Sequence, residues 1–258
     1  MAKKRSAARR AESQAAAARA ASIRREQERR ERRRRSLVVT GVGLLLLALI
    51  LVVGYVVQSS RDSTGGTAAA PAGAAGYALP VGQPDAPTTV TIYEDFLCPY
   101  CAEFEQASRD WLAQYAREGK VEVRYRAISI LDDASNGTEY STRAGNALAV
   151  VLDASGPGVA KSFHDTLFEN QPDEGSDGLS DDRLVELAVA AGATRSAVEP
   201  GITNRTFEQW VANGTDAASK EDGYQGTPMV QVDGKLFDDY ETMDQLSTNL
   251  KKAVDETE

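Results

Sequence analysis

An uncharged run of 21 residues, Leu37–Val57, constrains the organisation of this chain more than any other feature. As a helix rising about 1.5 Å per residue, the run would span roughly 31 Å, which is close to the thickness of a bilayer's hydrocarbon core. A cleaved signal peptide has a shorter apolar region with small residues directly behind it. Here the first Ala-rich stretch begins eleven residues after Val57. The sequence therefore predicts an uncleaved transmembrane signal-anchor.

The charged residues are divided sharply on either side of this run. Residues 1–35 contain 14 Lys and Arg against 4 Asp and Glu, whereas the remaining residues contain 15 against 34. Because basic residues mark the cytoplasmic side, we expect a single-pass protein of the cell membrane with its N-terminus in the cytoplasm. The net charge of −19 after residue 35 argues against nucleic-acid binding by the outer part.

Four segments follow from these patterns. Residues 1–36 are a basic cytoplasmic tail, 37–57 the transmembrane segment, and 58–76 a flexible linker rich in Gly, Ala, Ser and Thr. Residues 77–258 are expected to form one extracytoplasmic domain, long enough for a single hydrophobic core.

The only two cysteines, Cys98 and Cys101, lie in one tetrapeptide. The alternating residues 89–93 predict a strand before it, and an apolar stripe predicts a helix from it to about Gly119. Residues 121–125 alternate again and predict a second strand. The cysteines are therefore expected at the strand-to-helix turn of a β–α–β unit.

This position favours redox chemistry. A sulfur at the start of a helix lies near free N–H groups and the positive end of the helix dipole, so the pKa of Cys98 should be lowered. Pro99 suits the first helical position, and Cys101, one turn into the helix, should be the more buried resolving thiol. A structural zinc site needs four ligands, whereas the chain has two cysteines and one histidine. We expect no cofactor and no metal.

The rest of the domain alternates between helical and extended patterns. Apolar residues at helical spacing predict helices within 140–167, from Ser180 to Gly192, and around 207–211. After Gly226-Thr227-Pro228, residues 229–232 and 235–237 flank Asp233-Gly234, which predicts a hairpin, and a last helix covers 243–254. The order is β-α-β, a helical block, then β-β-α, an α/β domain.

The segment 90–104, VTIYEDFLCPYCAEF, resembles the active-site stretch of the DsbA-like thioredoxin family, and Gly226-Thr227-Pro228 resembles the cis-proline loop of that family. Membrane-anchored members occur in actinobacteria. The resemblance implies a thioredoxin-like fold with a DsbA-type helical insertion. It also implies a catalytic Cys98–Cys101 pair and an active-site loop for substrate formed by Pro99, Tyr100, Thr227 and Pro228, with a cis bond before Pro228.

The same resemblance implies partners: unfolded exported proteins that carry thiols, and a membrane redox protein of the DsbB or VKOR type. Family members often place a buried acid six residues before the first cysteine, where this chain has Ile92. Glu94 or Asp95 is the alternative proton relay, unless both are solvated loop charges. Pro-Tyr between the cysteines and Thr before the proline also resemble glutaredoxins and periplasmic isomerases. A disulfide-forming oxidase and a reductase or isomerase therefore both stay open.

A copper-handling module is the non-enzymatic alternative. Soft thiolates bind Cu(I), and the only histidine, His164, would be the third ligand beside the two cysteines. We favour a packing or helix-surface position for His164.

Overall fold

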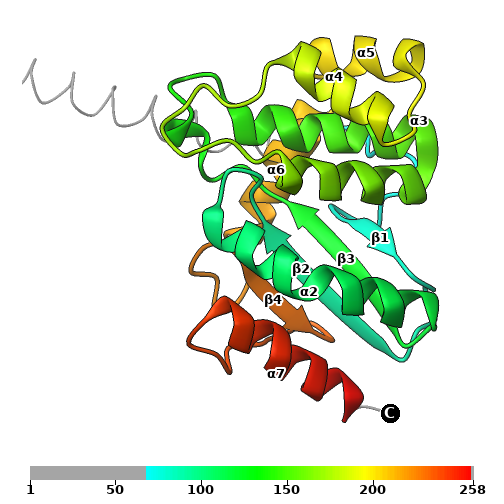
Figure 1. The fold of residues 1–258 in the computed structure, drawn as a ribbon, viewed down its shortest axis with the longest axis vertical. Coiled ribbons are helices and arrows are strands. Elements are labelled where there is room, and N and C mark those ends of the chain that lie inside the picture. The colour runs from blue at the N-terminus through cyan, green and yellow to red at the C-terminus, as the bar shows by residue number, and fades with distance from the viewer. Residues whose placement is uncertain (1–67, 257–258) are drawn as a thin grey trace, which may run out of the picture. The chain divides into compact units, whose positions relative to one another are not determined.

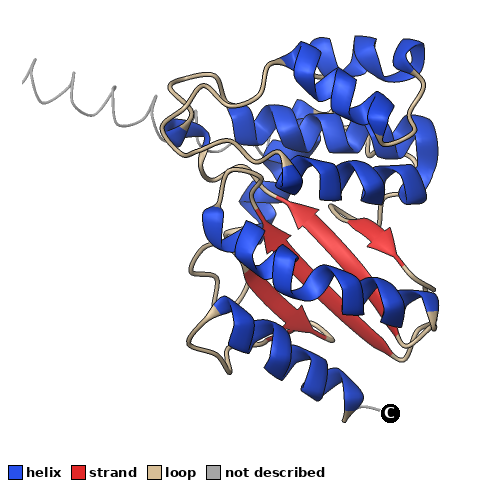
Figure 2. Ribbon diagram, viewed as in Figure 1, coloured by secondary structure: helices blue, strands red, loops and turns tan. Residues whose placement is uncertain are grey.

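The computed structural model describes residues 68–256, whose centre is a five-stranded sheet in the order β1-β3-β2-β4-β5. β2 and β3 are parallel, whereas β1 lies antiparallel to β3 and β4 antiparallel to both β2 and β5 (Figure 2). The strands are β1 (Leu79–Val81), β2 (Thr88–Glu94), β3 (Val121–Ala127), β4 (Met229–Val232) and β5 (Lys235–Leu236).

The helices form two groups. α2 (Pro99–Arg117) and α7 (Met243–Asp255) pack against each other in front of the sheet in Figure 1. A block of four helices is inserted between β3 and β4, and it lies beyond the upper end of the sheet in that view. These are α3 (Tyr140–Glu169), α4 (Asp181–Ala190), α5 (Arg195–Thr203) and α6 (Glu208–Ala218), preceded by a short 3₁₀ turn at Asp132–Ala134. The predicted β-α-β, helical block, β-β-α order is confirmed.

Local sequence explains the details. Ser180 caps α4 as predicted, because its hydroxyl accepts the backbone N–H of Arg183. α3 is interrupted at Gly156, whose φ of 78° and ψ of 173° are not helical, and Pro157 follows it. This break separates the two apolar stretches that the sequence placed in one helical region.

The sequence did not predict two of the elements, a strand and a helix. β1 is only three residues long and contains Pro80, while α5 contains Pro200 and Gly201, so neither shows a clear periodic pattern. The first part of the linker predicted for 58–76 lies outside the described residues. In the described part, Pro71 is buried, and the Ala72 N–H donates to Asp153 at 2.8 Å.

The predicted span at 37–57 lies outside the described residues. Within residues 68–256, none of the helices has both the length and the apolarity needed to cross a membrane.

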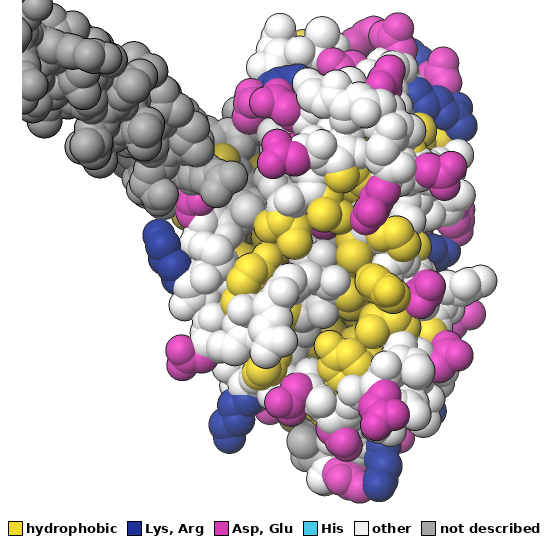
Figure 3. All heavy atoms as spheres, turned by 90° about the vertical axis from the view of Figure 1, so that its left-hand side faces the viewer, with side chains coloured by type: hydrophobic (Ala, Val, Ile, Leu, Met, Phe, Trp, Pro, Cys, Tyr) yellow, Lys and Arg dark blue, Asp and Glu magenta, His cyan; other side chains and the backbone are white. Residues whose placement is uncertain are grey.

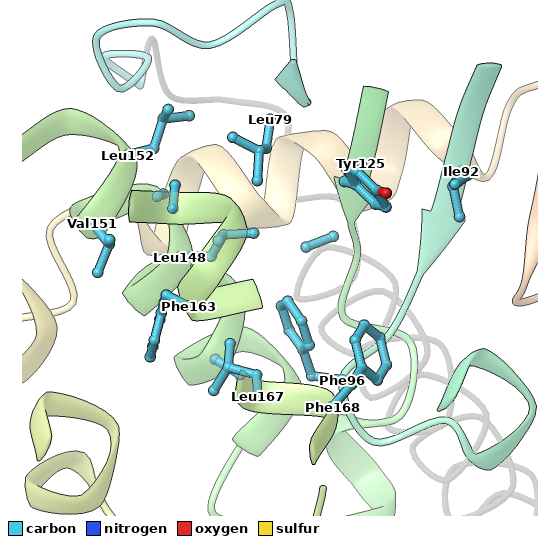
Figure 4. Close-up of a cluster of buried hydrophobic side chains, with 14 of the residues drawn as sticks. Leu79, Ile92, Phe96, Tyr125, Leu148, Val151, Leu152, Phe163, Leu167 and Phe168 are labelled. Carbon is cyan, nitrogen blue, oxygen red and sulfur yellow. The ribbon is translucent and has the colours of Figure 1, made fainter. Parts of the chain in front are cut away.

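The main core lies between the sheet, α2 and the kinked α3 (Figure 4). Leu148, Phe163 and Leu167 project from α3 into this core. At its edge, the Phe96 and Phe168 rings meet with their centroids 5.0 Å apart. Phe96 precedes the cysteine turn by two residues and is fully buried, so the turn is anchored in the core.

Candidate active site

The two cysteines lie at the start of α2, where the sequence placed them. Cys98 is the N-cap residue, Pro99 occupies the first helical position, and the Cys101 N–H donates to the Cys98 carbonyl at 3.1 Å. Both cysteines are free thiols, of which Cys98 is 5% exposed and Cys101 1%. Tyr100, between them, is 61% exposed. Cys98 is therefore the thiol nearer to solvent.

The Thr227–Pro228 loop faces this turn across 129 residues of sequence. The peptide bond between Thr227 and Pro228 is cis, as expected. The Cys98 thiol donates to the Thr227 carbonyl oxygen, with Sγ 3.4 Å from the oxygen. The structure thus brings together the two motifs on which the family resemblance rests.

The two thiols differ strongly in acidity. A hydrogen bond from the Cys101 thiol has the largest effect on the pKa of Cys98, which falls from 9.0 to about 6 although burial opposes the change. The Thr227 side chain and the N–H groups of Tyr100 and Cys101 act in the same direction as the Cys101 thiol. Burial raises the pKa of Cys101 well above 9.0, and the hydrogen bond with Cys98 adds to this rise. One thiolate is thus prepared for exchange while its neighbour is held as a thiol.

Asp95 is not a solvated loop charge but a fully buried acceptor. Its carboxylate accepts the N–H groups of Leu97, Ile130 and Leu131 at 2.9–3.0 Å and the Ser141 hydroxyl at 2.6 Å. Burial raises its pKa to about 7 despite these bonds. Asp95 therefore joins the cysteine turn to the loop after β3 and to α3.

Glu94 is also fully buried, and its partner is His164. His164 Nε2 lies 2.6 Å from Glu94 Oε1, and His164 Nδ1 lies 3.1 Å from Asp165 Oδ1. Both ring nitrogens of His164 are therefore occupied by carboxylates. The packing position predicted for His164 holds, and the helix-surface alternative is wrong, because its side chain is 0% exposed.

The copper-handling alternative is contradicted by the same geometry. Among residues 68–256, the only three His, Cys, Asp or Glu ligand atoms lying within 4.8 Å of one another belong to Glu94, Glu105 and His164, and this cluster contains no cysteine. The cluster fits a metal poorly too. Ligands of a tetrahedral ion about 2.0–2.1 Å from each donor are more than about 3 Å apart, whereas Glu94 and His164 are at hydrogen-bond distance. Lys161 and Arg109 also place positive charge beside the cluster.

Sequence reasoning missed two residues beside the cysteines. Glu105 lies four residues after Cys101 on α2, is fully buried, and has no hydrogen-bond partner on either carboxylate oxygen. Burial raises its pKa to about 7. Gln171 donates to the carbonyls of Phe96 and Cys98 at 3.2 and 2.9 Å. Helical spacing from Cys101 could have identified Glu105, whereas no local pattern marks Gln171.

Two hollows meet at Thr227, and one of them includes Cys98. The groove at Cys98, of about 490 Å³, contains mainly apolar surface, and a second hollow of about 260 Å³ is lined by the proline loop and by residues of β4 and β5. Figure 3 shows hydrophobic side chains gathered across the middle of a face of the molecule. The first groove is lined by Cys98, Pro99, Tyr100, Glu103, Ile130, Leu131, Glu174 and Thr227. An extended chain with apolar side chains fits such a surface.

Comparison with known proteins gives a consistent result. The family model described as thioredoxin matches residues 75–252. The reduced disulfide oxidoreductase DsbG of Mycobacterium tuberculosis is 29% identical, with a TM-score of 0.61 over 76% of this chain and 91% of that one. Oxidised DsbA of the same organism is 30% identical, with a TM-score of 0.57 over 70% of this chain and 97% of that one.

A longer protein shares part of this sequence. The serine/threonine-protein kinase PknE of M. tuberculosis is 30% identical over 166 residues, which cover 62% of this chain but only 29% of the kinase. The family model and the DsbA match, by contrast, cover most of the described domain. The chain therefore belongs to the DsbA-like members of the thioredoxin family.

Proposed function

We propose that the protein forms disulfide bonds in exported proteins, through the Cys98–Cys101 pair, on the outer side of the cell membrane. The observation that carries this proposal is the contrast between the cysteines: Cys98 has a lowered pKa and lies against the Thr227 carbonyl, while Cys101 is buried with a raised pKa. A stabilised Cys98 thiolate favours the reduced enzyme and so makes its disulfide a good oxidant.

The reaction proceeds by two exchanges. A substrate thiolate attacks Cys98 Sγ of the oxidised pair, which breaks the disulfide and releases Cys101. A second thiolate of the substrate then attacks the substrate sulfur of the mixed disulfide and expels Cys98 as a thiolate. The substrate leaves with a new disulfide, and the enzyme leaves with two reduced cysteines.

The active-site loop holds the substrate during these steps. Pro99, Tyr100 and Thr227 line the apolar groove together with Cys98. Because the groove is mostly apolar, it suits unfolded segments whose hydrophobic side chains are still exposed. Glu94 is the proton relay for Cys101, since its charge is among the causes that raise the Cys101 pKa, whereas Asp95 is engaged in four hydrogen bonds.

The cellular setting rests on the sequence. The basic tail, the apolar run at 37–57 and the acidic remainder support a membrane-anchored protein whose domain faces outward. There the reduced pair needs an electron acceptor, and a DsbB- or VKOR-type membrane protein would supply it.

The first test is the reduction potential of the full chain, measured by equilibration with glutathione buffers. A value toward about −120 mV supports the oxidase, whereas one near −200 mV or lower would assign the reductase or isomerase function instead. Cys98→Ser must abolish oxidation of a reduced substrate protein. Activity retained by this variant would contradict the proposal, and Val189→Ala, a change at an exposed position of α4, provides a folded control.

A further inference from the structure

Behind Cys101 lies a buried group of ionisable side chains, of which the proposed function gives a role to Glu94 alone. Glu94 ends β2, Glu105 lies on α2, and His164 lies on α3; all three are 0% exposed. Their ligand atoms lie within 4.8 Å of one another. Burying three such groups is costly unless they share charge and protons.

This group adjoins the resolving thiol. Glu105 follows Cys101 by four residues on α2, and side chains at that spacing on a helix are neighbours. The second oxygen of Glu94, Oε2, is buried and has no hydrogen-bond partner. The negative charge of Glu94 is also felt at Cys101, whose pKa it helps to raise. Glu94 thus has one oxygen on His164 and one oxygen free.

His164 is held in the state of a proton donor. Nδ1 faces Asp165, whose side chain is 24% exposed, and Nε2 faces Glu94. Burial on its own lowers the pKa of His164, but the negative charges of Glu94 and Glu105 and the hydrogen bond to Asp165 together outweigh it, and the pKa rises to about 9. The imidazole is therefore protonated on both nitrogens at neutral pH. Asp165 fixes the ring and is itself bonded to Lys161.

We propose that His164 stores the proton that Cys101 needs as it leaves the disulfide, and that Glu94 transfers this proton. The inference rests on the proposed function and deepens it, since it concerns the same thiol pair. Glu94 acts on the leaving thiolate, whereas His164 and Asp165 are positioning residues that act through Glu94.

Proton transfer accompanies the opening of the disulfide. The substrate thiolate forms a bond with Cys98 Sγ, the Cys98–Cys101 bond breaks, and its electron pair goes to Cys101 Sγ. A proton passes from His164 Nε2 to Glu94 and from Glu94 to Cys101. Neutral His164 then keeps its other proton on Nδ1, toward Asp165. In the reverse reaction Cys101 returns the proton by the same route and attacks Cys98.

The charged and titratable groups around His164 come from three elements besides β2. They are Glu105 and Arg109 of α2, Tyr125 of β3, and Lys161 and Asp165 of α3 itself. The Tyr125 ring packs on the imidazole with the centroids 4.5 Å apart. These groups change the pKa of His164, whereas its hydrogen bonds to Glu94 and Asp165 determine the path that the proton takes.

The test is the rate at which glutathione opens the disulfide of the oxidised full chain. The mixed disulfide is trapped with acid and counted by mass spectrometry, and the rate is divided by the glutathione thiolate concentration at each pH. In the wild type this rate should fall above about pH 9, when His164 loses its proton. His164→Gln keeps a donor toward Glu94. At pH 7 the rate for this variant should be at least about 10-fold slower than for the wild type, because general acid catalysis contributes about 10²–10⁴-fold. The rate for this variant should also show no fall above about pH 9.

Two further variants separate proton storage from packing. Phe168→Leu disturbs a ring 5.2 Å from the imidazole but leaves both hydrogen bonds of His164 in place, so its pH profile should match that of the wild type. Asp165→Asn keeps an oxygen toward Nδ1 but removes the charge, so the fall in rate should move to lower pH. The Asp165 side chain is partly exposed, so this second variant still tests the proposal if His164→Gln does not fold.

The outcomes are distinct. A wild-type chain that forms no mixed disulfide would refute the proposed function. If the wild type reacts, but His164→Gln and Asp165→Asn both keep its rate and its pH profile, only the proton store is refuted. The same holds if Phe168→Leu slows the reaction as much as His164→Gln does.

Discussion

Ionisation of Cys98 near pH 6 can be measured directly, and it tests the central feature of the site. With the pKa lowered from 9.0 to about 6, about 90% of Cys98 is thiolate at pH 7, against about 1% for an unperturbed thiol. Thiolates of lower pKa are weaker nucleophiles, by about 15–30-fold for such a shift. The net gain in alkylation rate at pH 7 is therefore only about 3–6-fold, and the midpoint of the pH profile is the informative quantity.

The assay is alkylation of the reduced chain by iodoacetamide between pH 4 and pH 10, read by mass spectrometry. We expect one fast site with a midpoint near 6, because Cys101 is buried and its pKa is raised. Cys98→Ser should leave no fast site in the folded chain.

Matched variants of Cys101 test the cause. Its thiol donates the hydrogen bond with the largest effect on the Cys98 pKa. Cys101→Ala should therefore raise the midpoint, whereas Cys101→Ser, which keeps an O–H donor, should retain most of the shift. A wild-type midpoint above 8, or equal midpoints in the two variants, would refute this account of the site.

Three further changes probe the surrounding structure. Gly178→Ala should destabilise the fold by about 2–4 kcal/mol in urea unfolding, because φ is +67° and the new Cβ would lie 2.4 Å from Tyr140 Cγ. The matched control, Gly175→Ala, has a φ of +80° and open space around the new Cβ, so it should destabilise the fold by only about 1 kcal/mol. In the folded chain, burial raises the pKa of Glu105 from 4.5 to about 7. Its contribution to the free energy of unfolding is therefore complete below pH 4.5 and is lost as the pH rises through 7. Glu105→Gln should make the free energy of unfolding depend less on pH. Gln171→Ala removes the side-chain donor to the Phe96 carbonyl and one of the donors to the Cys98 carbonyl, which also accepts the Cys101 N–H. The change should lower stability by about 1–3 kcal/mol and speed amide exchange at the active-site turn, and an unchanged exchange rate would contradict the bonds seen.

Periodic patterns predicted most of the elements, and they failed where the pattern is short or interrupted. The alternation in β2 and the apolar stripe of α2 placed the cysteine turn correctly, because both elements extend over enough residues to show their period. β1 was missed since three strand residues show no period. Pairing with β3, a tertiary contact, makes it a strand.

The buried acid shows what one sequence could and could not predict. Side chains in a strand alternate between its faces, so Glu94 shares a face with Val90 and Ile92, both buried in the main core. The burial of Glu94 was therefore readable from β2. The acid expected from the family pattern at Ile92 is instead supplied two residues later on the same face.

His164 follows the same reasoning on a helix. It lies in a stripe with Ala160, Phe163, Leu167 and Phe168, all buried, so helical spacing alone places it in the core rather than at the surface. Which groups it meets there could not be read from the sequence, because Glu94 is 70 residues away and the break at Gly156 sets the direction of the second half of α3. A polar residue in an apolar stripe needs a buried partner. Here that partner is Glu94, on the inner face of the strand that enters the active-site turn, so Glu94 and His164 form one site.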